Sequence, residues 1–377
     1  MIPNYIWQHI IGIISDYRGD IPLSAFLKKY FKSCPNAGSR DRKLITDMAF
    51  AWYRCSKGLP QQIKDTLQPE FKNQMLQCMQ LTRNNFSGKY TGLICDNALD
   101  TEVDLMALLP YDIELSDDIN KQDWLSTMLV QPNTFIRIRN QKDKIEKTLT
   151  DNLIPYNYIN ADCISVPSAT KIDTLLPAES YVIQDASSQF AASNFKPKKT
   201  EKWYDCCSGA GGKSLYLKDI EPNIDLTISD KRPNIIHNLL ERFELYKHQK
   251  PTVQTLDLTD LVKTTKVFGA TKFDNIICDA PCSGSGTWAR TPEQLYFFKE
   301  SQLQFYTELQ KAIATNVSEF LKVGGFFYYI TCSIFKQENE IIVANISKIT
   351  GMELIESKLI NGTKIKADSM FIAIFRK

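Results

Sequence analysis

The stretch KWYDCCSGAGGKSLYLKDI, residues 202–220, decides the fold. Its first part, KWYDCC (202–207), is a short run typical of a buried strand, and the part from Lys213 onward has helical spacing. The glycines between the two parts allow the backbone to approach a ligand closely and open the helix N-terminus toward that ligand. The stretch therefore predicts a strand, a ligand-facing turn and a helix.

From this unit to the last residue, segments typical of strands alternate with segments typical of helices. The further predicted strands are residues 224–230, 252–257, 273–279 and 324–331, and the predicted helices are residues 233–246, 301–321 and 336–349. Repeated strand–helix units imply a mostly parallel sheet that helices cover on both faces. Two final strands, 352–359 and 370–377, have no helix between them, so we expect a closing hairpin with one antiparallel strand.

Two regions of different character precede this sheet. Residues 1–122 are predicted to form an N-terminal helical domain, in which Leu44, Ile45, Met48 and Trp52 share one helix face. Residues 123–180 combine short strands with one helix and predict a small α/β (RRM-like) subdomain, too small to hold a large core alone. Residues 181–377 complete the α/β chain as its large domain, and residues 84–92 are expected to be a loop.

Composition limits the protein's class. With 43% hydrophobic residues among 377, the chain can build real cores, and it has no apolar run of the roughly 18–20 residues that a bilayer span requires. Its first twenty residues predict an amphipathic helix and no signal peptide. The ten cysteines show neither zinc-type spacing nor a disulfide framework. We therefore expect a cytoplasmic protein with free thiols, no bound metal and no membrane contact.

The net charge of +2 does not by itself indicate a nucleic-acid partner. The charge is uneven, however, because eight basic residues between positions 28 and 57 are opposed only by Asp41 and Asp47. The eight are Lys28, Lys29, Lys32, Arg40, Arg42, Lys43, Arg54 and Lys57. Such an excess can contact phosphates, although a solvated helix face is the simpler explanation.

Aspartates end, or nearly end, four consecutive predicted strands: Asp205, Asp230, Asp257 and Asp279. In open α/β sheets, ligands bind beyond the carboxyl ends of the strands. One aspartate there is unremarkable, but four in consecutive units indicate an extended ligand that lies across the strand ends.

The glycine-rich loop CSGAGGKS, residues 207–214, departs from two common phosphate-binding motifs. A P-loop requires glycine where this chain has Cys207, and a dinucleotide fingerprint requires a third glycine where it has Ser214. A nucleoside-type ligand remains, either S-adenosylmethionine or a nucleotide, with its ribose hydroxyls bonded by Asp230.

Two cysteines follow predicted strands at the same ligand-facing edge. DAPCSGSGTWARTPE, residues 279–293, fixes Asp279 and Cys282 in one proline-containing turn, and Cys332 follows the next strand in YYITCS. A lone cysteine is usually a small buried hydrophobe. That explanation suits Cys34, Cys55, Cys78, Cys95, Cys163 and Cys278. It suits Cys282 and Cys332 poorly, whereas the simplest role for Trp288 is packing beside the loop.

Five motifs occur in the order and spacing of the Sun/RsmB-type RNA cytosine-C5 methyltransferases, and residues 124–377 resemble that family. The motifs are QDASSQFAA (184–192), DCCSGAGGKS (205–214), DAPCSGSGTWARTPE (279–293), TCSIFKQENE (331–340) and DSMFIAIFRK (368–377). The resemblance implies a Rossmann-like, S-adenosylmethionine-dependent methyltransferase domain. It also implies that a monomeric enzyme methylates C5 of a cytosine in RNA, with ribosomal RNA as the main expectation and transfer RNA as the alternative.

The resemblance assigns the cofactor site residue by residue. The cofactor loop would consist of Cys207, Ser208, Gly209, Ala210, Gly211, Gly212 and Lys213. Asp230 would hold the ribose and Asp257 the adenine end, and Asp279, which is also counted among the cofactor-binding residues, would bond the cytosine. The loop departs from the family, which has Ala and Pro where this chain has residues 208–210. The strand at residues 137–139 reads Arg-Ile-Arg in place of Arg-Val-Asn, which weakens the expectation that the small subdomain positions RNA.

The resemblance also assigns two thiols, Cys332 as the nucleophile and Cys282 as the residue that assists product release. Cytosine C5 attacks a methyl sulfonium poorly, but addition of a thiolate at C6 makes C5 enamine-like. An acid group near N3, expected to be Asp279, favours this addition, and a base must then remove the C5 proton. The base must be reachable in single-stranded or flipped-out form.

The sequence leaves two alternative functions to consider. DNA cytosine methyltransferases use the cysteine of a Pro-Cys pair as nucleophile, but the thiol of the TCS motif argues against that mechanism here. A catalytically silent RNA-binding ribosome-assembly factor would need neither cysteine, so the intact pair and the four aspartates argue against it.

Overall fold

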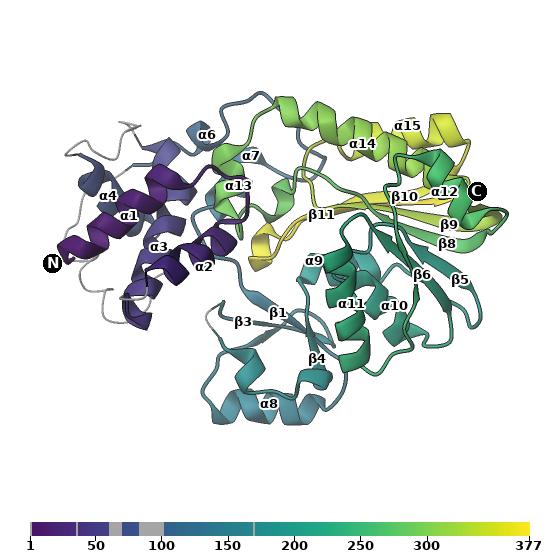
Figure 1. Ribbon diagram of the computed structural model, residues 1–377, viewed down its shortest axis with the longest axis horizontal. Coiled ribbons are helices and arrows are strands. Elements are labelled where there is room, and N and C mark those ends of the chain that lie inside the picture. Colours follow the sequence, from purple (N-terminus) through teal and green to yellow (C-terminus); the bar gives the residue numbers. More distant parts are fainter. Residues whose placement is uncertain (1, 35–36, 60–69, 83–101, 169) are drawn as a thin grey trace. The chain divides into compact units, whose positions relative to one another are not determined.

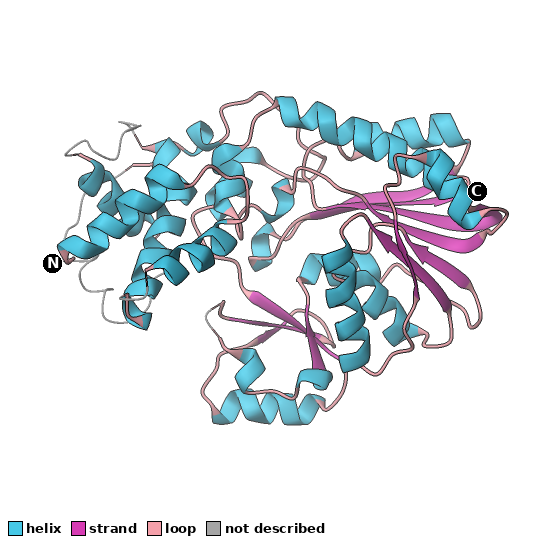
Figure 2. Cartoon of the chain, viewed as in Figure 1, coloured by secondary structure: helices cyan, strands magenta, loops and turns pink. Residues whose placement is uncertain are grey.

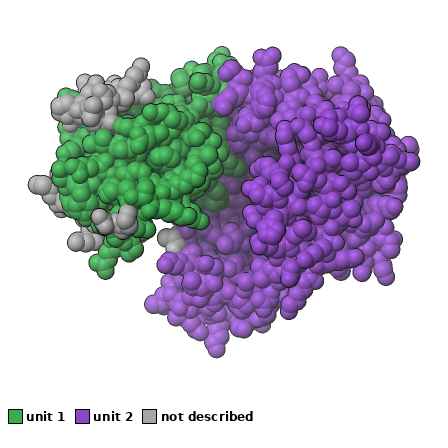
Figure 3. All heavy atoms as spheres, viewed as in Figure 1, with its two compact units in different colours: residues 1–113, 120–132, 287–300 green, residues 114–119, 133–286, 301–377 purple. Residues whose placement is uncertain are grey.

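A computed structural model describes residues 2–34, 37–59, 70–82, 102–168 and 170–377 (Figures 1 and 2). The predicted loop at 84–92 and Cys95 lie outside these residues. Within them, no helix is both long and apolar enough to cross a membrane. The chain divides into two compact units, coloured separately in Figure 3. Unit 1 comprises residues 1–113, 120–132 and 287–300, and unit 2 comprises residues 114–119, 133–286 and 301–377.

Unit 1 is helical in the part that the structure describes, as the sequence predicts. Its helices are α1 (Asn4–Asp16), α2 (Leu23–Ser33), α3 (Ser39–Cys55), α4 (Phe71–Leu81), α6 (Leu105–Leu108), α7 (Lys121–Thr127) and α13 (Pro292–Phe297), with a 3-10 turn at Ser56–Gly58. The predicted stripe of α3 is buried, because Leu44, Ile45, Met48 and Trp52 all lie in the core of this unit. The segment 287–300, from the middle of the predicted large domain, packs into unit 1 as well.

Unit 2 contains a small antiparallel sheet with the strand order β2-β3-β1-β4. Its strands are β1 (Thr134–Ile138), β2 (Asn157–Tyr158), β3 (Cys163–Val166) and β4 (Tyr181–Ile183), and helix α8 (Lys142–Asp151) packs on it through Ile145 and Leu149. The small sheet thus continues three residues past the predicted boundary at 180, since β4 pairs with β1.

The second sheet of unit 2 has seven strands in the order β10-β11-β9-β8-β5-β6-β7. The strands are β5 (Lys202–Asp205), β6 (Asp225–Asp230), β7 (Thr252–Thr255), β8 (Phe273–Asp279), β9 (Leu321–Thr331), β10 (Glu353–Ile360) and β11 (Met370–Arg376). Strands β5 to β9 pair in parallel, and β11 lies antiparallel between β9 and β10. The predicted parallel sheet with a closing hairpin and one antiparallel strand is confirmed.

Helices cover both faces of this sheet (Figure 1). Helices α9 (Ala186–Ala192), α10 (Gly212–Ile220) and α11 (Pro233–Leu245) pack on one face, and α12 (Leu261–Phe268), α14 (Ser301–Ser318) and α15 (Glu340–Thr350) on the other. Neighbouring strand residues face opposite sides, so Trp203 lies in one core and Tyr204 in the other. Both faces of the central strands are therefore buried, which explains apolar runs such as residues 276–278 of β8 and 327–330 of β9.

Two helix boundaries differ from the prediction. The predicted helix 336–349 begins only at Glu340, because residues 336–339 form a turn in which the side chains of Glu338 and Asn339 bond inward. The predicted helix 301–321 ends at Ser318, and Leu321 already starts β9. This turn therefore contributes polar side chains to the surroundings of Cys332.

Candidate active site

The parallel strands bring the predicted site residues to one edge of the seven-stranded sheet. Asp205, Asp230 and Asp279 are the last residues of β5, β6 and β8, and Asp257 lies two residues beyond β7. Cys332 directly follows β9. Since β5 to β9 are parallel, all these positions lie at or just beyond the carboxyl ends of the strands.

The predicted cofactor loop turns from β5 into α10 through two glycines with positive φ. Gly209 has φ 50° and Gly211 has φ 80°, a region that side-chain-bearing residues rarely adopt. A Cβ on Gly211 would come within 2.7 Å of Leu239, so a larger residue is excluded by packing as well. A Cβ on Gly209 would meet nothing within 4 Å, so the loop presents bare backbone to open space at this point.

Asp230 is nearly buried and lies against this loop. One of its oxygens accepts the backbone N–H of Gly209 at 3.0 Å, and both oxygens accept bonds from Arg232 at 2.9–3.0 Å. Burial alone would raise the pKa of Asp230, but the bonds from Arg232 and Gly209 outweigh it and lower that pKa. The side chain of Arg232 is 62% exposed and can move into solvent, which would free the carboxylate for another donor.

Asp257 lies on the more open side of the same edge. Its carboxylate accepts a hydrogen bond from Lys231 at 2.6 Å and another from the Thr259 hydroxyl at 2.7 Å. These bonds lower the pKa of Asp257 to about 2. It is therefore an ionised acceptor in the strand-end row, as the sequence predicts for its position.

Asp279 is paired with the lysine of the glycine-rich loop. The Lys213 ammonium group lies 2.7 Å from one carboxylate oxygen of Asp279. The lysine side chain is almost buried, whereas the aspartate side chain is 32% exposed. The pair joins the predicted cofactor loop to the DAPC turn, a link that the sequence did not reveal because the residues are 66 positions apart.

Asp205 differs from the other three strand-end aspartates, because it is almost completely buried. One oxygen accepts the Ser214 hydroxyl at 2.6 Å, at the start of α10, and the other has no hydrogen-bond partner among the described residues. Burial raises the pKa of Asp205 to about 7. Asp205 is therefore a buried support of the loop, and the expectation that all four strand-end aspartates contact a ligand does not suit its position.

The two predicted reactive thiols lie together. The sulfur atoms of Cys282 and Cys332 are 3.2 Å apart, and both residues are partly exposed. The hydrogen bond to Cys332 and burial raise the pKa of Cys282, so Cys282 keeps its proton beside the other sulfur. The two cysteines follow neighbouring parallel strands, in which Asp279 of β8 is in register with Ile330 of β9.

The loops that carry the thiols are joined to each other and to the C-terminal motif. The N–H of Gly286 donates to the carbonyl of Cys332 at 2.9 Å, and the N–H of Ser369 donates to the carbonyl of Gly286 at 2.9 Å. A Cβ on Gly286 would lie 1.9 Å from the Ser369 carbonyl oxygen, so only glycine allows this contact. The last glycine of the DAPCSGSG motif thus has a packing reason.

A buried carboxylate beside the thiols was not predicted from the sequence. Glu338 is completely buried, and its oxygens accept hydrogen bonds from Ser283, Ser333 and Gln310. The available signal was a glutamate six residues after Cys332 in the TCSIFKQENE motif. The predicted helix over this segment concealed it, because that helix implied a solvent-facing side chain.

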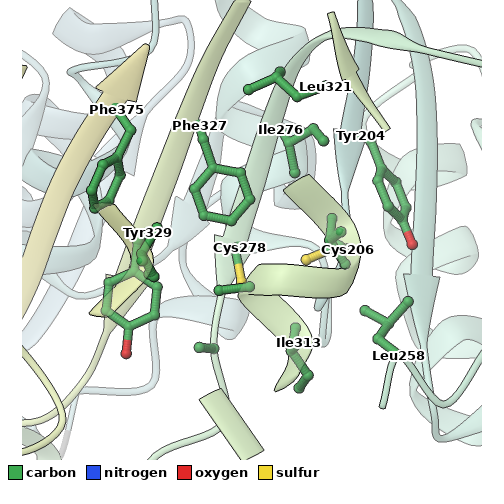
Figure 4. Close-up of a cluster of buried hydrophobic side chains, with 14 of the residues drawn as sticks. Tyr204, Cys206, Leu258, Ile276, Cys278, Ile313, Leu321, Phe327, Tyr329 and Phe375 are labelled. Carbon is green, nitrogen blue, oxygen red and sulfur yellow. The ribbon is translucent and has the colours of Figure 1, made fainter. Parts of the chain in front are cut away.

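Among the described cysteines that were expected to be structural, Cys34 is only partly buried. The others, Cys55, Cys78, Cys163 and Cys278, are buried. Cys278 is fully buried in the core between β5, β8, β9 and α14, where its sulfur lies beside that of Cys206 (Figure 4). Trp288 is fully buried in unit 1 and packs against Trp124 and Phe298, which confirms its packing role.

The basic run at residues 28–57 is only partly a surface feature. Arg54 is 1% exposed, and its guanidinium donates to the carbonyls of Met128 and Ala289 at 2.8 and 2.7 Å. Burial lowers its pKa to about 10. Arg54 therefore cannot contact a ligand. A hollow in unit 1 is lined by Lys28, Phe31, Lys32 and Arg42. The three basic residues remain candidates for contact with phosphates.

The unusual Arg-Ile-Arg strand has a structural explanation. Arg137 of β1 and Arg139, which directly follows β1, both form ion pairs with Asp219 of α10, at 2.6 and 2.7 Å. His248 lies 2.7 Å from the same carboxylate. These contacts tie the small sheet to the large one within unit 2. The arginines are thus engaged inside the protein, and they do not form an exposed basic strand.

Comparison with known proteins gives matches to the region that holds this site. Residues 192–375 match the sequence profile of a family described as 16S rRNA methyltransferase RsmB/F. The ribosomal RNA small subunit methyltransferase B of Shewanella oneidensis is 34% identical over 160 residues, 42% of this chain and 36% of that protein. The probable ribosomal RNA small subunit methyltransferase B of Bacillus subtilis is 30% identical over 165 residues, 43% and 36% of the two chains. The chain covers little more than a third of the length of these relatives.

Solved structures match the fold over more of the chain. The crystal structure of PH0851 covers 100% of this chain and 99% of its own, with a TM-score of 0.73 and 16% identity. A methyltransferase homolog protein from Pyrococcus horikoshii covers 70% and 92%, with a TM-score of 0.59 and 19% identity. NSun6 from the same organism, solved with SFG, covers 68% and 94%, with a TM-score of 0.60 and 14% identity. At these identities the likeness establishes the fold, which is the predicted Rossmann-like methyltransferase fold.

The buried Asp205 predicts a specific pH dependence of stability. The unfolded carboxyl loses its proton near pH 3.8, whereas the folded one keeps it to about 7. The folded state therefore binds more protons in this window, and this contribution to stability is lost as the pH rises through it. Asp205→Asn removes the titration and can still accept the Ser214 bond. Its free energy of unfolding, measured in urea, should rise relative to wild type from about pH 4 to about pH 7.5.

Asp225→Asn is the matched control, because Asp225 lies exposed at the opposite end of β6. That substitution should leave the pH profile of stability parallel to that of the wild-type protein. Parallel profiles for Asp205→Asn as well would show that Asp205 is ionised in the folded protein.

Proposed function

We propose, because residues 192–375 match the profile of the 16S rRNA methyltransferase RsmB/F family, that this chain methylates C5 of a cytosine in ribosomal RNA. The methyl donor in the proposal is S-adenosylmethionine, and NSun6, a protein of the same fold, was solved with the S-adenosylmethionine analogue SFG. The single observation that carries the proposal is the pair of thiols 3.2 Å apart at the carboxyl ends of β8 and β9.

The residues at the strand ends fit the proposed cofactor. S-adenosylmethionine supplies an electrophilic methyl group on a sulfonium, and it needs a close backbone, a ribose acceptor and an adenine-side acceptor. The bare backbone at Gly209 and the N-terminus of α10 provide the first. Asp230 provides the second once the exposed Arg232 side chain moves aside, and Asp257 lies one strand further along.

Cys332 carries the covalent step in this proposal. Its thiolate adds to C6 of the cytosine, which forms an S–C6 bond and makes C5 able to accept the methyl group. The Asp279–Lys213 pair lies at the same edge, so Asp279 can bond the pyrimidine ring while the lysine ammonium balances negative charge there. Loss of the C5 proton then restores the ring double bond and expels the Cys332 thiolate.

Cys282 acts in the second half of this sequence. The raised pKa of Cys282 keeps its proton in place while the neighbouring sulfur attacks, so the two thiols do not compete as nucleophiles. The 3.2 Å separation lets both sulfurs border one base. Cys282 therefore assists the release of methylated cytosine from Cys332.

Unit 1 is proposed to contribute to RNA binding through Lys28, Lys32 and Arg42, and the whole protein to act as a cytoplasmic monomer. The choice of ribosomal over transfer RNA rests on the named relatives. Bisulfite sequencing of total RNA, with and without the gene, tests that choice directly. We expect one cytosine of the small-subunit ribosomal RNA to lose its protection in the deletion strain, whereas loss at a transfer RNA position would transfer the proposal to that substrate.

Asp230→Ala is expected to weaken S-adenosylmethionine binding about tenfold or more, because a carboxylate bonded to ribose hydroxyls is worth more than a neutral hydrogen bond. Calorimetric titration measures this affinity without RNA. Asp225→Ala, at the other end of the same strand, is the control and should bind as wild type does. Equal affinities for the two variants would remove Asp230 from the cofactor site.

The cysteine roles predict different trapped species. Removing Cys282 leaves the attack intact, so Cys282→Ala should accumulate an enzyme–RNA species that survives denaturing gel electrophoresis. Cys332→Ala and the double variant should give neither this species nor methylation, because no S–C6 bond can form. An adduct in Cys332→Ala would reverse the two roles and favour the Pro-Cys mechanism. Full activity in both single variants would exclude covalent catalysis by these residues.

A further inference from the structure

The carboxylate of Glu338 accepts four hydrogen bonds in the buried space behind the two thiols. One oxygen accepts the backbone N–H of Ser283 at 2.7 Å and the Gln310 amide at 3.1 Å. The other oxygen accepts the hydroxyls of Ser283 and Ser333, each at 2.5 Å. Four bonds fill the acceptor positions of a carboxylate, so this side chain is fully committed to its neighbours.

The residues that Glu338 holds are the immediate successors of the two thiols. Ser283 follows Cys282 in the turn after β8, and Ser333 follows Cys332 after β9. A single buried side chain therefore bridges the two loops whose cysteines lie 3.2 Å apart. Ser285 supports the bridge, since its hydroxyl lies 3.1 Å from that of Ser333.

The bridge is unequal on its two sides. Ser283 donates two hydrogen bonds to Glu338, one from its backbone N–H and one from its hydroxyl, whereas Ser333 donates one, from its hydroxyl. The Cys332 side is also held by Asn339, which bonds the hydroxyl of Thr331 at 2.6 Å and the carbonyl of Ser333 at 2.9 Å. Loss of the Glu338 bonds should therefore displace Cys282 more than Cys332.

We propose that Glu338 is a positioning residue that fixes Cys282 against Cys332, and that product release depends on it more than attack does. The inference rests on the proposed function, because it assigns Glu338 to one half of that reaction. A displacement of about 1 Å at a reacting group can reduce a rate on the order of a hundredfold, so small shifts of Cys282 have measurable consequences. After the bond to Cys332 and burial, the Glu338 carboxylate also contributes to the raised pKa of Cys282.

Glu338→Gln tests this role in the full-length protein. The amide keeps the shape of the side chain but places a donor where the carboxylate accepts, so it cannot satisfy all four partners. We expect the variant to accumulate the denaturation-resistant RNA adduct, as Cys282→Ala does. Multiple-turnover methylation should fall about tenfold or more, while single-turnover adduct formation and S-adenosylmethionine affinity stay within about threefold of wild type.

Glu353→Gln is the matched control, because Glu353 is exposed at the start of β10, and its register through β11 to Phe326 of β9 places it at the opposite end of the sheet from Cys332. It should turn over as wild type does, without an adduct. The ratio of adduct formed to adduct released distinguishes positioning from general destabilisation, because a merely unstable enzyme loses both steps together. Adduct release at the wild-type rate in Glu338→Gln overturns the inference.

Two milder variants cover the case in which Glu338→Gln does not fold. Ser283→Ala breaks the side-chain bond on the Cys282 side, and Ser333→Ala breaks the bond on the Cys332 side. We expect more trapped adduct in Ser283→Ala, and an equal or reversed order would overturn the inference. An adduct in Cys282→Ala but in none of these variants defeats only the role of Glu338. No adduct and no methylation in any protein, wild type included, defeats the proposed function itself.

Discussion

The site depends on the parallel pairing of β8 with β9. This pairing sets Asp279 in register with Ile330, so the DAPC turn and the TCS turn leave the sheet side by side at the same edge. The backbone bonds of Gly286 with Cys332 and Ser369 then fasten the two turns together, and Glu338 bridges them from behind. The 3.2 Å between the thiols is the outcome of these constraints.

Much of the fold could be predicted because the central strands of the large sheet are buried on both faces. Apolar runs such as residues 276–278 and 326–330 mark these strands, so their order and helical connections are visible in the sequence. The division into compact units was less accessible. Packing of α13, residues 292–297, with the N-terminal helices depends on contacts such as Glu293 with Leu23, 270 positions apart, which no local pattern records.

The predicted site residues are brought to one edge, but their partners were not foreseeable from spacing. Lys213 reaches Asp279, and Arg232 covers Asp230, through side-chain geometry that a motif does not encode. Asp205 ends its strand as other aspartates do, but it is buried and accepts a hydrogen bond from the Ser214 hydroxyl. Glu338 was hidden because its segment has helical spacing but forms a turn.

The most direct test of covalent catalysis by this pair uses RNA that contains 5-fluorocytidine. Fluorine at C5 cannot leave as a proton does, so the reaction should stop after methyl transfer, with the base still bonded to the protein. Digestion and mass spectrometry of the wild-type complex then identify the bonded residue. We expect a methylated fluorocytidine on Cys332. A fluorocytidine on Cys282, or no covalent species under conditions in which ordinary RNA is methylated, would contradict it.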